Sequence, residues 1–201
     1  MRKVWSGTIL LLLVLLASVV LTGCQKPPEQ DLAAAEAALA DARSSEAETY
    51  AATELSAVQS QIDSAKAEID ALKQKWFPNY DAVKQTLAAA KAAAEQAKTT
   101  AIANKEQAQK DAQAAIEEAK AAITAAEESL KTAPKGKGTK ADLEMFTSDL
   151  EGAKTQVADA EAAMSAGKFY EARDKAKAVA DKANQIVSEI QAIADKLKGK
   201  K

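Results

Sequence analysis

The strongest constraint on the fold is an apolar stripe that recurs at intervals of three and four residues through most of the chain. From Leu55 to Trp76 these intervals run without a missed step. Such spacing places apolar residues on one face of a helix, as in a coiled-coil seam. Alanine fills much of the stripe, and alanine, glutamate, lysine and glutamine all favour helix. No segment after Asp31 has the pattern of a strand, so the sequence predicts an all-α fold.

Breaks in the stripe divide the predicted helices into two antiparallel hairpins. The first hairpin comprises residues 31–132, with a bend near 44–52 and a turn near 76–80. The turn is predicted because Pro78 cannot continue a helix. The bend is predicted because the apolar face before it does not continue in register after it.

The second hairpin is predicted at residues 141–198, with a turn near 166–168. Gly167 can adopt the left-handed conformation that often ends a helix. A loop rich in proline, glycine and lysine, 133–140, separates the hairpins, and 199–201 form a basic tail. The alanine-rich seams are narrow, so we expect the elongated hairpins to pack as a helical bundle.

Most of the large apolar side chains near the turns are aromatic. We interpret them as hydrophobic plugs that fasten each hairpin, and the alternative is an aromatic ligand pocket. The residues concerned are Trp76, Phe77 and Tyr80 at the first turn, and Met164, Phe169 and Tyr170 at the second.

The N-terminus has the features of a secretory signal peptide. A basic start precedes the apolar run Ile9–Leu21. As a helix this run would be roughly 20 Å long, too short for a bilayer core of about 30 Å. Leu21, Thr22, Gly23 and Cys24 follow the pattern of the bacterial lipobox. This resemblance implies cleavage after residues 1–23, a diacylglycerol on the Cys24 thiol, and acylation of the new N-terminus.

Cys24 is the only cysteine, so it cannot form an internal disulfide. Several acyl chains hold a protein stably on a membrane, whereas one does so only marginally. The alternative is a chance cysteine in a short anchor helix. Residues 24–30 are predicted to be the lipidated N-terminus and an extended spacer containing Pro27 and Pro28. By resemblance to enterobacterial lipoproteins, Gln25 favours the outer membrane, facing the periplasm.

The composition argues against most kinds of chemistry. The sequence contains no histidine, which removes imidazole as a metal ligand or catalytic base. Its carboxylates alternate with lysine and alanine, as expected of a solvated helix face. The net charge is −2, with no basic face for nucleic acid. We therefore expect no enzymatic activity, no cofactor and no metal.

Two longer stretches resemble a known family. The segments YAATELSAVQSQIDSAKAEI from Tyr50 and AEAAMSAGKFYEARDKAKAVADKA from Ala160 are similar to uncharacterised alanine-rich helical lipoproteins of bacterial envelopes. Their domain typically reads Tyr-Ala-Pro-x-Glu-Leu, a long helix, Gly-x-Tyr-x-x-Ala and a second helix. In this sequence Thr53 follows two alanines where proline is expected. The family has no assigned activity, so the resemblance implies architecture and not function.

Our leading hypothesis is a lipid-anchored, non-catalytic envelope protein that acts as a periplasmic spacer or interaction scaffold. Its partners would be membrane lipid through acylated Cys24, and an unknown envelope protein or a second copy. The alternative is a cell-wall tether, because murein lipoproteins similarly combine an acylated cysteine, an alanine-rich coiled coil and a terminal lysine joined to peptidoglycan. Lys201 would be the attachment residue, although their Tyr-Arg-Lys ending is absent. A third possibility has amphipathic helices lying on lipid.

Overall fold

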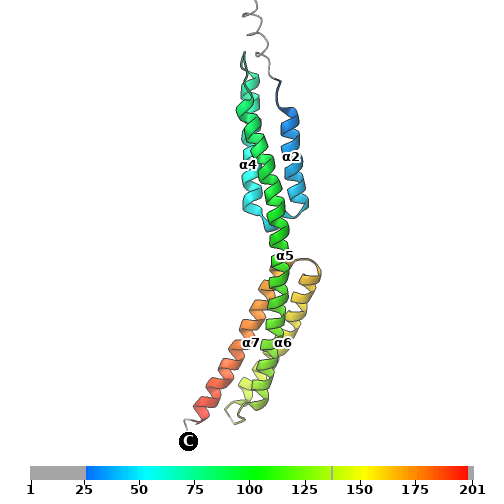
Figure 1. Ribbon diagram of the computed structural model, residues 1–201. Coiled ribbons are helices and arrows are strands. Elements are labelled where there is room, and N and C mark those ends of the chain that lie inside the picture. The colour runs from blue at the N-terminus through cyan, green and yellow to red at the C-terminus, as the bar shows by residue number, and fades with distance from the viewer. Residues whose placement is uncertain (1–25, 137, 199–201) are drawn as a thin grey trace, which may run out of the picture. The chain divides into compact units, whose positions relative to one another are not determined.

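The computed structural model describes residues 26–136 and 138–198, and these residues form helices and connecting turns without any strand (Figure 1). The all-α prediction is confirmed, and the helices pack against one another as a bundle. The helices are α2 (Glu29–Ser44), α3 (Ala47–Tyr50), α4 (Ala52–Lys73), α5 (Asp81–Thr132), α6 (Lys140–Ser165) and α7 (Phe169–Lys198).

The helices group into two compact units that divide within α5, between Asn104 and Lys105. Unit 1 contains α2, α3, α4 and the N-terminal part of α5, and unit 2 contains the rest of α5 with α6 and α7. This grouping differs from the two predicted hairpins, 31–132 and 141–198. The physical reason is that α5 is one helix of 52 residues, and its two parts supply seams to different cores.

The core of unit 1 is built from the predicted seams. Its largest fully buried side chains include Ile62 of α4 and Leu87 of α5, neither of which has any exposed surface. Four alanines of α5 are equally buried and let the neighbouring helices approach closely. They are Ala90, Ala94, Ala97 and Ala101.

Polar contacts at the rim fix the register of α2 against α4. The Lys66 ammonium lies 2.7 Å from the Glu36 carboxylate, and the Arg43 guanidinium donates to the Gln59 side chain at 2.7 Å. Arg43 is seven residues after Glu36, whereas Gln59 is seven residues before Lys66. The two helices are therefore antiparallel.

The bend between α2 and α4 lies within the predicted range 44–52. Glu46 adopts a left-handed conformation with φ of 61°, which turns the chain into the single-turn helix α3. The Asn104 amide donates to the Tyr50 backbone carbonyl at 2.7 Å and so connects the end of α3 to α5. The bend between α2 and α4 is therefore held in place by a hydrogen bond from α5.

Unit 2 has a single apolar core to which α5, α6 and α7 all contribute. Its members include Ile116 of α5, Phe146 and Leu150 of α6, and Ile186 of α7. Figure 1 shows α6 and α7 beside the C-terminal part of α5. The seam reaches this core through Ala108 and the fully buried Ala112, so it continues past the half-buried Lys105.

The predicted loop 133–140 connects α5 to α6 and is organised by a buried hydroxyl. The Thr139 side chain is 6% exposed, donates to the Pro134 carbonyl at 3.1 Å and accepts from the Gly136 amide at 3.0 Å. Because the Thr139 hydroxyl both donates and accepts a hydrogen bond, this polar group can be buried at the loop. Between α6 and α7 the turn is short, and Gly167 has φ of 75° as predicted for a helix end.

We predict opposite effects for alanine at two glycines of unit 2. Gly167→Ala should lower the free energy of unfolding by about 1 kcal/mol, because its left-handed backbone disfavours a Cβ atom although no heavy atom lies within 4 Å. Gly152→Ala, inside α6 and equally unobstructed, should raise it by roughly 0.5–1 kcal/mol. Urea denaturation followed by circular dichroism measures both. Two changes of the same sign would contradict the assigned conformations.

We predict that the small size of the buried alanines is required. Ala97→Leu should destabilise unit 1 by about 1–3 kcal/mol, because α5 has no space for a larger side chain at this position. The matched control, Ala92→Leu on the exposed face of α5, should change stability by less than about 0.5 kcal/mol. Thermal unfolding of both variants tests the difference. An equal cost at both positions would show that close packing does not limit side-chain size.

Candidate functional site

The residues that the sequence singled out for chemistry lie outside the described part of the chain. They are the lipobox Leu21, Thr22 and Gly23, the lipidation residue Cys24, and the C-terminal Lys201. Lipidation and attachment to peptidoglycan therefore remain predictions. The described residues closest in sequence to Cys24 are Lys26 and the two prolines that lead into α2.

The chain enters unit 1 through a proline-rich helix start. Pro28 is buried, and its carbonyl accepts from the Leu32 amide at 3.0 Å, while the Pro27 carbonyl accepts from the Glu29 amide at 2.8 Å. Proline costs no hydrogen bond at this point, because the first backbone amides of a helix have no acceptor within the helix. Glu29 and Asp31 place negative charge at the positive end of the helix dipole. Consequently α2 begins inside the predicted spacer 24–30, which is shorter than expected.

Two aromatic side chains lie on the surface, contrary to the prediction that they plug the first turn. Trp76 is 89% exposed and Phe77 is 73% exposed. Helix α4 ends at Lys73 because Pro78 has no amide to donate and disfavours helical geometry at the residue before it. Trp76 therefore lies beyond the end of α4 and is not on the buried helix face where the apolar spacing predicted it.

The other predicted plugs are placed differently from this pair. Tyr80 and Phe169 are buried, at 1% and 8% exposure, whereas Met164 is partly buried against the core of unit 2. Tyr170 is half-buried, and the Arg173 guanidinium lies 5.1 Å from its ring centroid. Pro78 correctly predicted the turn near 76–80, but the prediction that the Trp76 and Phe77 rings are buried there is wrong.

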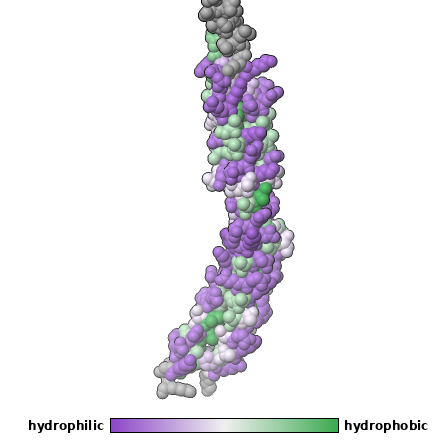
Figure 2. All heavy atoms as spheres, in the orientation of Figure 1, coloured by the Kyte–Doolittle hydropathy of each residue, from purple (hydrophilic) through white to green (hydrophobic). Residues whose placement is uncertain are grey.

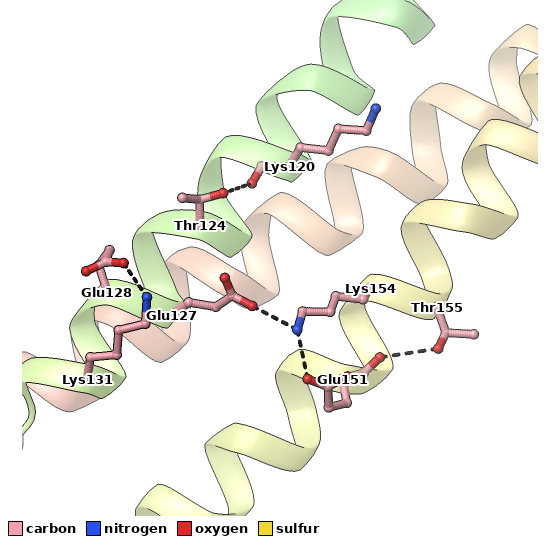
Figure 3. A network of polar contacts seen from close by, with 8 residues as sticks. All are labelled: Lys120, Thr124, Glu127, Glu128, Lys131, Glu151, Lys154 and Thr155. Atoms are coloured by element: carbon pink, nitrogen blue, oxygen red, sulfur yellow. Dashed lines mark hydrogen bonds and ion pairs between the residues drawn. The ribbon is translucent and has the colours of Figure 1, made fainter.

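The densest polar cluster of unit 2 joins α5 to α6. The Lys154 ammonium of α6 lies 2.8 Å from the Glu127 carboxylate of α5 and 2.8 Å from the Glu151 carboxylate of its own helix (Figure 3). A second pair between the same helices joins Lys120 to Glu161 at 2.8 Å. The three-residue spacing of Glu151 and Lys154 is compatible with their contact within α6, whereas no sequence pattern points to the contact of Lys154 with Glu127 of α5.

These ion pairs hold their groups in the charged state. The hydrogen bonds that Lys154 donates to Glu127 and Glu151 raise the pKa of Lys154, and accepting from Lys154 lowers the pKa of Glu127. Both shifts move the groups away from neutral pH, whereas a general acid or base works best with a pKa near the operating pH. The cluster is therefore suited to holding helices in register and poorly suited to proton transfer.

One hollow of unit 2 lies at the α5–α6 loop, is partly open to solvent and is lined by residues that include Leu130, Thr139 and Leu143. Within residues 26–136 and 138–198, no group of three histidine, cysteine or acidic side chains could hold a metal ion. No helix in the same ranges is long and apolar enough to cross a membrane. Figure 2 shows a mostly hydrophilic face with separate apolar areas.

Comparison with known proteins finds no matching family model, no matching curated protein and no matching solved structure.

We predict that the Glu127–Lys154 pair contributes stability only above acidic pH. The pKa of Glu127 lies below its ordinary value of 4.5 in the folded state. The contribution of the ion pair to stability is therefore complete above the ordinary pKa of 4.5, and it is lost as the pH falls through the folded-state pKa of Glu127. Wild type should melt slightly above Glu127→Gln at pH 7, and the gap should close towards pH 3.

The matched control is Glu128→Gln, because Glu128 pairs with Lys131 within its own helix. Melting curves between pH 7 and pH 3 should show a smaller gap from wild type for this variant than for Glu127→Gln. A gap for Glu127→Gln that stays constant with pH would mean that the carboxylate's charge contributes nothing to stability.

Proposed function

We propose that this protein is a lipid-anchored, non-catalytic helical protein of the bacterial envelope, acting as a periplasmic spacer or interaction scaffold. The observation that carries the proposal is the short apolar run followed by the lipobox-like residues Leu21–Cys24. The outer membrane, facing the periplasm, is the proposed location because Gln25 follows the cysteine. The folded body begins at Glu29, so little chain separates the proposed anchor from it.

The chemistry of the described surface supports a non-catalytic role. Lys154 and Glu127 are paired, and the pairing raises the pKa of Lys154 and lowers that of Glu127, so both lie away from neutral pH. The chain contains no histidine, and its only cysteine is the proposed lipid-bearing residue. These features favour a protein that works through its shape and surface.

The construction of the helices supports the scaffold role. Helix α5 contributes apolar seams to the cores of both units as one helix of 52 residues. The exposed faces carry charges of both signs, as in the pairs Lys91–Glu95 and Lys140–Glu144, which favour solubility and leave these faces available to a protein partner. We propose that this partner is another envelope protein or a second copy of the chain. The resemblance to alanine-rich envelope lipoproteins agrees with the proposed anchor and the helical architecture, and it supplies no function.

We predict that the anchor depends on the single thiol at Cys24. Wild type expressed in a bacterial host should yield a mature protein that begins at Cys24, carries acyl chains and sediments with membranes. Cys24→Ser should lack the lipid mass, because a hydroxyl does not replace the thiol in this processing. Mass spectrometry of the N-terminal peptide and membrane fractionation measure both properties. A mature wild-type protein without lipid would refute the proposed function.

The same cells distinguish the scaffold from the alternative cell-wall tether. Sacculi washed in hot detergent and digested with muramidase should release none of this protein if it is a scaffold only. Release from wild-type cells, but not from cells carrying Lys201→Arg, would establish a covalent link through the terminal lysine. Crosslinking in intact cells, followed by mass spectrometry, would then identify the protein neighbours.

A further inference from the structure

Trp76 and Phe77 form an exposed aromatic pair, whereas the other aromatic residues of the described chain are buried or half-buried. We name residues 74–80, between α4 and α5, the aromatic loop. Trp76 and Phe77 are more exposed than any other large apolar residue of the described chain, the next being Met145 at 52%. Tyr50 and Phe146, by contrast, are 5% and 3% exposed.

Unit 1 does not need this pair to close its core. Leu72, which precedes the loop, and Tyr80, its last residue, are buried, and so is Pro28 at the start of α2. The Asn79 side chain accepts from the Asp81 amide at 2.8 Å and so begins α5. In unit 2 the turn between α6 and α7 takes only three residues, 166–168. The aromatic loop is thus longer than the turn of unit 2, and it carries two exposed aromatic residues.

The aromatic loop lies at the end of unit 1 where the chain arrives from Cys24. The contact of Glu36 with Lys66 sets the antiparallel register of α2 and α4. Seven residues back from Glu36 is Glu29, the start of α2, and seven residues on from Lys66 is Lys73, the end of α4. Figure 1 shows this loop and the start of α2 at the same end of unit 1.

The distance from the proposed anchor to this end is short. Lys26, the first described residue, is two residues after Cys24. Two residues span at most about 7 Å, whatever their conformation. Acyl chains on Cys24 would therefore bring the aromatic loop close to the same bilayer.

The composition of this end fits the boundary between lipid and water. Tryptophan concentrates at that boundary because its ring is apolar and its N–H is polar. Lysine side chains can extend along apolar surface while the ammonium stays in water. The charges nearly balance, so the surface fits neutral headgroups and does not require anionic lipid. Exposed lysines at this end are Lys26, Lys73 and Lys75, and exposed acidic residues are Glu29, Asp31, Asp70 and Asp81.

We propose that the aromatic loop is a membrane-docking element, in which Trp76 and Phe77 insert into the headgroup region of the bilayer that holds Cys24. This inference rests on the proposed lipid anchor. Insertion would add a second point of attachment and hold this end of unit 1 against the membrane. Insertion is favourable because it removes from water two aromatic side chains that are otherwise largely exposed.

Tryptophan fluorescence of the mature protein tests the docking directly. The chain has two tryptophans, and the other, Trp5, lies in the predicted signal peptide, so Trp76 is the sole reporter once residues 1–23 are removed. Acylated protein is reconstituted in phosphatidylcholine vesicles, and its mass confirms that it begins at Cys24 and carries lipid. Trp76 should be quenched by brominated phosphatidylcholine and protected several-fold from aqueous acrylamide.

The matched control moves the reporter to the opposite end of unit 1. The variant Trp76→Phe/Thr49→Trp places tryptophan at an exposed position of α3, where brominated lipid should not quench it and acrylamide should reach it freely. Circular dichroism verifies that the variant is folded. Equal accessibility of the two reporters would overturn the docking proposal.

Two further outcomes separate the docking proposal from its alternatives. Protection of Trp76 from acrylamide without quenching by brominated lipid would indicate that a second copy covers the loop, and would also overturn the proposal. Loss of the acyl mass would refute the lipid anchor. An acylated protein whose Trp76 stays in water would refute docking alone and leave the anchor intact.

Discussion

Close contact between helices across alanine seams is the interaction on which the rest of the structure depends. Ala94 and Ala97 have no exposed surface, so the helices around them approach to the distance that a methyl group allows. Each such contact buries little area, and stability must therefore accumulate along long seams. Larger residues such as Ile62 and Leu87 supply most of the local burial. The length of the helices follows from this requirement.

Charged residues at the rims complement the seams. Alanine faces alone specify register weakly, because successive alanines are nearly interchangeable. Pairs between helices, such as Lys66 with Glu36 and Lys154 with Glu127, favour one alignment over its neighbours. Exposed pairs of this kind add little stability. Their contribution is specificity, and the side chains they hold are unsuited to acid–base chemistry near neutral pH.

The two turns between antiparallel helices show how function can separate from folding. In unit 2 the turn is short, and Gly167 supplies the left-handed residue that the geometry requires. In unit 1 the aromatic loop carries Trp76 and Phe77 outward, although the core beneath is already closed by Tyr80. A surface that folding does not require is a reasonable place to look for a binding role, and its proximity to the proposed anchor points to the membrane.

The sequence by itself determined which segments are helical, where the main turns lie and most of the buried faces, because these depend on period, proline and glycine. It also provided the proposed lipidation site at Cys24, since that signal is a linear motif. Only the tertiary structure decided that the seams form two units dividing at Asn104, because periodicity defines a buried face but not the helix that covers it. The exposure of Trp76 was decided in the same way: its seam position predicted burial, but α4 ends before reaching it.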